Sequence, residues 1–194
     1  MRIVAGEFRG RELVTPAGDT TRPTAARARE ALFSILADVR EALVLDLYAG
    51  SGALGLEALS RGADRAVFVE TNKAAQRAIK SNVATLGLDD RATLLPLKAE
   101  ASLRALERLG PFSLVFADPP WADAQAALGI LERLADAALL TPAARLVLEH
   151  AARSGPVLAE KSPLCALDTR RWGDTAVTLF EARSESENGP AGGP

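Results

Sequence analysis

Cysteine, histidine and long apolar runs are scarce in this chain of 194 residues, and each scarcity excludes something. The one cysteine, Cys165, rules out an internal disulfide and a metal centre built on several thiolates, so we expect no metal. No apolar run approaches the roughly 18 residues of a membrane-spanning helix. Residues 1–20 also lack the apolar core of a signal peptide, so we expect a soluble, cytoplasmic protein without membrane contact.

A large excess of charge is absent as well, because the formal net charge is −2. The charge is nevertheless uneven: residues 1–30 contain six arginines and four acidic residues. An arginine-rich segment on an acidic body favours a phosphate-bearing partner, although an ordinary solvated surface would show the same small excess.

The hydrophobic content, 48%, suffices for one domain with a full core. Beyond Ala42, apolar runs alternate with segments of helical periodicity, which predicts a mainly parallel sheet covered by helices on both faces. The predicted strands are Leu43–Leu47, Ala66–Val69, Ala92–Leu97, Leu114–Ala117 and Leu146–Leu148, and the predicted helices are Ala53–Arg61, Lys73–Leu86, Ala101–Leu109 and Ala124–Leu139. Two last runs, Leu164–Arg171 and Ala176–Ala182, predict an antiparallel hairpin at a sheet edge.

The two ends of the chain differ from this central part. Arg2–Ala5 and Glu12–Thr15 flank a segment with two glycines, a pattern that predicts a small β-hairpin, and Thr24–Val39 predicts a helix. Residues 184–194 contain only Ser, Glu, Asn, Gly, Ala and Pro, so we expect a disordered tail. We therefore divide the chain into an N-terminal extension (1–40), a main domain (41–183) and this tail.

A glycine motif, Gly50-x-Gly52-x-x-Gly55, lies between the strand Leu43–Leu47 and the helix that follows it. That context is typical of a nucleotide-binding turn, in which the glycines allow a tight turn and close approach of the ligand. Glu70 ends the next predicted strand, where an acid would hold ribose hydroxyls.

Asp46 distinguishes between the cofactors that such a turn could bind. Dehydrogenases share the glycine pattern, so a nucleotide-binding oxidoreductase is one alternative. An acid directly before the loop would repel a pyrophosphate, whereas it could accept hydrogen bonds from the cationic amino group of S-adenosylmethionine, which we therefore predict as the cofactor. Tyr48 and Ser51 belong to the same predicted site. Two interpretations of Glu100 stay open, namely a contact to the adenine amine and an exposed acid at a helix start.

A second motif, Asp118-Pro119-Pro120-Trp121, follows the fourth predicted strand and suits an amine on a planar ring. The lone pair of such an amine is delocalised into the ring. A carboxylate at Asp118 and the backbone carbonyl of Pro119 could each accept one N–H and so direct the lone pair toward the methyl donor. The prolines fix φ and remove backbone donors. Trp121 offers a flat face to a base taken out of its stack.

The stretches around both motifs resemble the RsmD family, bacterial methyltransferases that act on the N2 amine of guanine in small-subunit (16S) ribosomal RNA. The resembling stretches are Arg2–Gly6, Arg9–Arg11, Arg22–Thr24 and Leu45–Ala63. The resemblance implies a Rossmann-like class I methyltransferase with a seven-stranded, mostly parallel sheet and an N-terminal β-hairpin that helps to hold RNA. It also implies S-adenosylmethionine in the Gly50–Gly55 loop, Glu70 on its ribose, and the target guanine at Asp118–Trp121.

The resemblance suggests a role in RNA binding for the N-terminal arginines. Arg9, Arg11, Arg22, Arg27 and Arg29 are candidate RNA contacts, and the alternative for some of them is pairing with acids of the main domain. The partner would be small-subunit ribosomal RNA, free or in an assembled particle, and we expect the protein to be a monomer.

The sequence departs from the pattern of the family at two positions. Trp121 stands where the family more often has Phe or Tyr, and Glu100 stands where Asp or Asn is common.

Two other functions remain as alternatives. An N6-adenine DNA methyltransferase would share Asp-Pro-Pro-Trp, but such enzymes usually carry a target-recognition region for which this chain has little room. A non-catalytic, RNA-binding ribosome-assembly factor is disfavoured by the intact donor and acceptor motifs.

Overall fold

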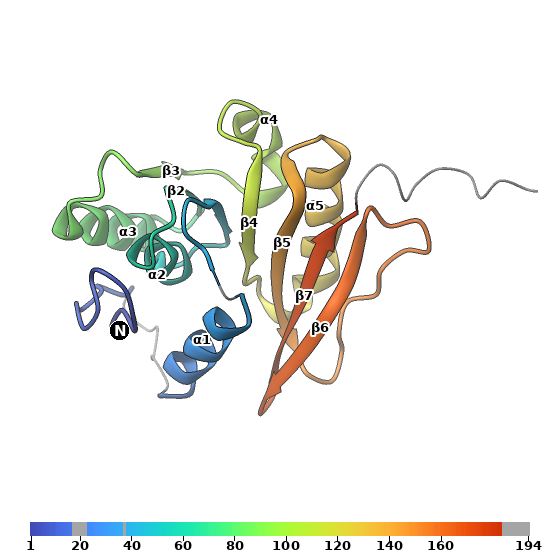
Figure 1. Ribbon diagram of the computed structural model, residues 1–194, viewed down its shortest axis with the longest axis horizontal. Coiled ribbons are helices and arrows are strands. Elements are labelled where there is room, and N and C mark those ends of the chain that lie inside the picture. The colour runs from blue at the N-terminus through green and yellow to red at the C-terminus, as the bar shows by residue number, and fades with distance from the viewer. Residues whose placement is uncertain (17–22, 37, 184–194) are drawn as a thin grey trace, which may run out of the picture.

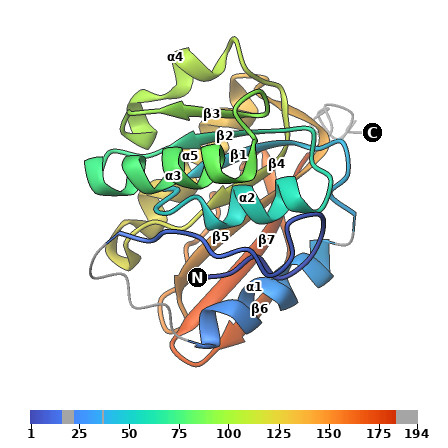
Figure 2. The same ribbon diagram turned by 90° about the vertical axis from the view of Figure 1, so that its left-hand side faces the viewer.

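The computed structural model describes residues 1–16, 23–36 and 38–183, with side chains from Arg29 onward in the first helix. A single seven-stranded sheet runs through the molecule, and helices pack on both of its faces (Figure 1, Figure 2). The strands are β1 (Leu43–Leu47), β2 (Arg65–Val69), β3 (Ala92–Leu95), β4 (Phe112–Ala117), β5 (Leu140–Ala151), β6 (Leu164–Trp172) and β7 (Thr175–Ala182). The helices are α1 (Pro23–Leu36), α2 (Ala53–Ser60), α3 (Lys73–Leu86), α4 (Leu103–Leu106) and α5 (Ala124–Asp136), with short 3-10 turns η1 (Ala99–Ala101) and η2 (Trp121–Asp123).

The strands follow the order β3-β2-β1-β4-β5-β7-β6, and among the described strands β7 alone runs in the opposite direction to the others. This order confirms the predicted α/β class and the mostly parallel sheet with an antiparallel edge hairpin. The strand β1 pairs with β2 on one side and β4 on the other, so the direction of winding reverses between them. Open α/β sheets bind ligands at such a point, beyond the carboxyl ends of the strands.

Each face of the sheet has its own hydrophobic core. One core joins α1, α2 and α3 to the sheet through Phe33, Leu56 and Ile79, and the other joins α4 and α5 through Leu106 and Leu128. Side chains alternate between the two faces along every strand. A polar residue at a strand end therefore lies on the face of the sheet that this alternation gives it.

The N-terminal segment differs from the predicted hairpin. A single antiparallel bridge, Arg2 to Glu12, replaces two regular strands, and the amides of Ile3 and Leu13 donate across it to the carbonyls of Arg11 and Met1. The buried carboxylate of Glu57 accepts hydrogen bonds from the amides of Val4 at 2.8 Å and Ala5 at 3.0 Å. The segment is therefore bound to the main domain through its own backbone.

Gly6 shows how closely this segment approaches α2. Its φ is +84°, and a Cβ atom placed on it would lie 1.8 Å from the carbonyl oxygen of Ser60. The amide of Glu7 donates to that same oxygen at 2.7 Å. Only glycine fits this contact.

The largest difference in element length concerns β5, which begins at Leu140 instead of the predicted Leu146. Its first half contains Pro142 and Ala143, the latter with φ +57°, and the pairing with β4 shifts register there. This irregularity hides the strand from a search for alternating residues. The predicted tail, 184–194, lies outside the described residues, and no helix among those described is long and apolar enough to cross a membrane.

Candidate active site

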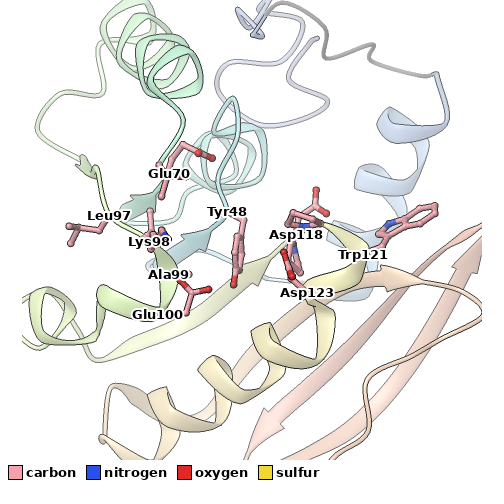
Figure 3. A pocket seen from close by; sticks show the side chains of 13 residues that line it. Tyr48, Glu70, Leu97, Lys98, Ala99, Glu100, Asp118, Trp121 and Asp123 are labelled. Carbon is pink, nitrogen blue, oxygen red and sulfur yellow. The ribbon is translucent and has the colours of Figure 1, made fainter.

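A cavity of about 650 Å³ lies at the carboxyl edge of the sheet, where the winding reverses. Its walls come from the ends of β1, β2 and β4 and from the residues around η1 and η2 (Figure 3). Tyr48, Glu70, Glu100 and the whole Asp118–Trp121 motif line it. The structure thus brings together residues that the sequence separates by about seventy positions.

The glycine loop bends sharply beneath this cavity. Tyr48, Gly50 and Gly52 have φ values of +57°, +55° and +78°, and the amide of Gly52 donates to the carbonyl of Ala49 at 2.7 Å. A Cβ atom at Gly55 would lie 2.4 Å from the ring of Phe68 on β2. The first two glycines therefore permit the left-handed turns, and the third permits close packing of α2 on the sheet.

Glu70 connects the end of β2 to the glycine loop. One of its carboxylate oxygens accepts a hydrogen bond from the amide of Gly50 at 2.8 Å, and the other accepts from the amide of Asn72 at 2.7 Å. Two backbone donors thus hold the carboxylate at the cavity wall. Each oxygen retains a lone pair for a further hydroxyl donor.

Asp46 lies behind the loop, not in the cavity wall. Its side chain is 2% exposed and accepts a hydrogen bond from the amide of Gly55 at 2.9 Å. Burial, with smaller contributions from the negative charges of Asp118 and Glu70, outweighs the lowering effect of the Gly55 hydrogen bond and raises the pKa of Asp46 to about 8. The geometry gives Asp46 a role in anchoring the start of α2, and its contact with a cofactor amine stays a prediction.

Gly50, Ser51 and Gly52 also lie outside the cavity wall. Ser51 is buried, and its backbone carbonyl accepts a hydrogen bond from Asn82 of α3. The loop therefore shapes the cavity through its backbone course, and its own contacts to a cofactor remain predictions.

Tyr48 stands inside the cavity, between Glu100 and Asp118 (Figure 3). Its hydroxyl oxygen is buried and has no hydrogen-bond partner among the described residues. Burial raises the pKa of Tyr48 to about 12, with smaller contributions from the charges of Glu100 and Asp123. A buried polar group without a partner, on a residue with φ +57°, is the kind of feature that a bound ligand satisfies.

Glu149 is an acid of this site that the sequence analysis missed. In the β4–β5 pairing Ala117 lies opposite Leu148, so the next residues, Asp118 and Glu149, are neighbours at the sheet edge. Burial raises the pKa of Glu149 to about 8, and the charge of Asp118 adds to the shift. The rule that placed Asp118 at the carboxyl edge would also have found Glu149. The adjacent His150 points elsewhere, is buried and hydrogen-bonds Thr178 at 2.9 Å.

Lys98 and Trp121 occupy the margins of the cavity. Lys98, which the sequence analysis also missed, is the basic residue in a wall otherwise rich in acids. Trp121 is 49% exposed, and its ring points away from Tyr48 and Glu70 (Figure 3). An exposed ring at the rim is accessible to a partner outside the cavity.

The predicted RNA-binding arginines have different environments. Arg9 and Arg11 are exposed in the N-terminal segment. Arg29 is 6% exposed, donates to the carbonyl of Arg2 at 2.7 Å and lies 3.6 Å from Glu57, so its prediction as an RNA contact is wrong and the alternative of pairing with an acid holds. Arg22 and the side chain of Arg27 lie outside the described residues.

Comparisons with known proteins agree with this geometry. A family model described as "Conserved hypothetical protein 95" matches residues 1–181. "Putative rRNA methyltransferase YlbH" of Bacillus subtilis (strain 168) is 36% identical over 185 residues, which cover 94% of this chain and 100% of that protein. "Ribosomal RNA small subunit methyltransferase D" of Escherichia coli (strain K12) is 41% identical over 122 residues, but the match covers only 62% of this chain and 60% of that protein.

A solved structure supports the same fold. "Putative methyltransferase yhhF from Escherichia coli" superposes with a TM-score of 0.79 at 31% identity, over 94% of this chain and 97% of that one. The superposition therefore extends over nearly the whole of both chains.

Proposed function

Because this chain belongs to the family described as Conserved hypothetical protein 95, the RsmD family, we propose that it transfers a methyl group from S-adenosylmethionine to the N2 amine of a guanine in small-subunit (16S) ribosomal RNA. The observation that carries the proposal is the shared cavity. It places the Asp-Pro-Pro-Trp motif opposite Glu70 and next to Tyr48, so a donor and an acceptor would meet inside one space.

The residues of the cavity fit S-adenosylmethionine. Glu70, fixed by two backbone amides, would accept hydrogen bonds from the ribose hydroxyls. The unpartnered hydroxyl of Tyr48 would gain a polar partner. When bound, the cofactor supplies an electrophilic methyl group on a cationic sulfur, and the acids Glu70, Glu100, Asp118 and Asp123 favour that positive charge.

The same acids would favour release of the product. After transfer the sulfur is neutral, so its attraction to the acidic wall is lost. The acidic wall would therefore bind the methyl donor, which has one more positive charge, more tightly than the demethylated product.

Asp118 and Pro119 would orient the acceptor. The carboxylate of Asp118 accepts one N–H of the exocyclic amine and the carbonyl of Pro119 accepts the other, which directs the nitrogen lone pair toward the methyl group. Such orientation, more than strong base catalysis, supplies the rate. The proton that the methylated nitrogen sheds would pass first to Asp118, the nearest carboxylate.

A pair of variants tests this assignment of Asp118. Asp118→Ala should abolish methyl transfer to small-subunit RNA from cells that lack the gene, while calorimetry finds S-adenosylmethionine binding within a few-fold of wild type. Asp118→Asn, which keeps the shape and one acceptor oxygen, should retain a small part of the rate. Undiminished turnover in Asp118→Ala would remove this residue from the chemistry.

The nature of the product decides between the proposed function and its nearest rival. Nucleoside mass spectrometry of the modified RNA should find N2-methylguanosine and no new N6-methyladenosine. Methylation of adenine in DNA, or RNA binding without any transfer, would contradict the proposal and support one of the alternatives.

A further inference from the structure

A cluster of exposed arginines lies at the carboxyl edge of the sheet, on the side opposite the N-terminal segment, and the predicted RNA contacts do not include it. We call this part of the surface the rim; it consists of the turn of the β6–β7 hairpin and the segment that follows β5. The β6–β7 hairpin turns at this edge, because Ala151, at the end of β5, pairs with Thr175, and Thr175 pairs with Trp172. The amide of Ala152 also donates to the carbonyl of Asp174 in the turn at 2.8 Å. The segment after β5 and the hairpin turn therefore form one structure beside the site.

The register of the sheet places this rim close to the acceptor motif. Glu149, the neighbour of Asp118, pairs with Val177, and Val177 pairs with Arg170. Three steps between adjacent strands separate Asp118 from Arg170, which corresponds to about 14 Å at the usual strand spacing. An RNA strand whose base enters the cavity would pass within reach of arginine side chains there.

Three exposed arginines occupy the rim, Arg153, Arg170 and Arg171. Arg170 is paired with Asp168 at 2.6 Å. Arg153 and Arg171, by contrast, form no ion pair with any residue that the structure describes. Their guanidinium groups are therefore available to a ligand from outside.

The acidic cavity makes such cations necessary. Its wall contains the carboxylates of Glu70, Glu100, Asp118 and Asp123, so an RNA phosphate at the centre would be repelled. A neutral base can enter, but the phosphates on either side of it must be bound outside the cavity. Arg9 and Arg11 serve one side, and Figure 1 shows the β6–β7 hairpin on the other side of α1 from the N-terminal segment.

We propose that Arg153 and Arg171, at the turn of the β6–β7 hairpin, bind phosphates of the substrate RNA on the side of the target base away from the N-terminal segment. Arg171 lies on the opposite face of β6 from Arg170 and Trp172, and the packing of the Trp172 ring against the core beneath α1 fixes the backbone of the turn. The half-exposed ring of Trp121 lies at the rim of the same site. The inference rests on the proposed RNA methyltransferase function and adds a second phosphate-binding surface to it.

A double variant with a matched control tests the surface. The test pair is Arg153→Ala with Arg171→Ala, and the control pair is Arg104→Ala with Arg108→Ala, two exposed arginines in and after α4 that form no ion pair with any described residue. Both pairs remove two positive charges. Binding of small-subunit RNA from cells that lack the gene, free and as assembled particles, would be measured at several KCl concentrations, together with kcat and KM for methyl transfer.

The test pair should raise Kd and KM for the RNA several-fold with kcat and S-adenosylmethionine affinity unchanged, while the control pair stays near wild type. Losing two phosphate contacts should reduce the salt dependence, the slope of log K against log[KCl], by about 1.4 for single-stranded RNA. If the two pairs have the same Kd and KM for the RNA while the wild type is active, the rim does not bind phosphates, and the proposed methyltransferase function is unaffected. An inactive wild type that does not bind the RNA would overturn both.

Discussion

Replacing Asp46 with asparagine should raise the free energy of unfolding, by an amount that grows with pH. Asp46 is 2% exposed, and burial raises its pKa from 3.8 to about 8 in the folded protein. Between these two values the folded state keeps a proton that the unfolded state releases, so the acid lowers stability as pH rises from about 4 to 8. The asparagine of the variant does not titrate, yet its side-chain oxygen can still accept the amide hydrogen bond of Gly55.

The structure sets the size of this effect. A shift of about four pKa units, at 1.36 kcal/mol for each unit, corresponds to an upper limit of about 5 kcal/mol above pH 8. The charges of Asp118 and Glu70 contribute to the shift and can relax when Asp46 is replaced, so we expect about half of this limit. Spread over the window from about pH 4 to 8, this corresponds to an average growth of about 0.7 kcal/mol per pH unit in the difference between variant and wild type.

Urea unfolding of both proteins at pH 5, 6, 7 and 8 would measure this difference. Glu149 also has a raised pKa, but it is present in both proteins and largely cancels. Asp64→Asn is a control, because the Asp64 side chain is 69% exposed and its replacement should change stability little at any pH. A difference for Asp46→Asn that is constant from pH 5 to 8 would refute the argument, since it would mean that Asp46 is ionised in the fold.

Three other changes have defined outcomes. Gly6→Ala should destabilise the protein by roughly 2–4 kcal/mol in thermal or urea unfolding, because its Cβ would overlap the Ser60 carbonyl and its φ is +84°, and an unchanged midpoint would contradict this close contact. Glu70→Ala should weaken S-adenosylmethionine binding about ten-fold or more in calorimetry through loss of the ribose contact, and wild-type affinity would exclude Glu70 from the cofactor site. Replacing Arg9 and Arg11 by alanine should weaken RNA binding most at low salt, with no effect there counting against the N-terminal segment as an RNA contact.

The two motifs show what local sequence can reveal. Gly50–Gly55 and Asp118–Trp121 each follow a buried strand, and parallel strands end at one edge of the sheet, so their convergence at that edge was predictable from the sequence. The close packing at Gly55 also follows from the motif. Both features follow from the local geometry of a strand and the turn after it, which short stretches of sequence specify.

The misassigned residues depend on contacts between distant segments. Arg29 was a candidate RNA contact, with pairing to an acid of the main domain as the alternative, and Glu57 from α2 and the carbonyl of Arg2 enclose it. The amides of Val4 and Ala5 donate to Glu57, and the segment itself forms one antiparallel bridge instead of two regular strands. Nothing in the local sequence of residues 1–30 indicates that the carboxylate of Glu57, nearly thirty residues later, would be buried and accept these hydrogen bonds.

The sequence by itself determined the fold class, the order of the two motifs and the edge of the sheet at which they act, because strand and helix periods and glycine turns are local properties of the chain. Only the tertiary structure decided the electrostatics. The β4–β5 register places Glu149 beside Asp118, and burial behind the loop, not position in the sequence, raises the pKa of Asp46. Desolvation and the distance between charges are properties of the packed molecule, so the acidic cavity and its basic rim emerge only when the strands are assembled.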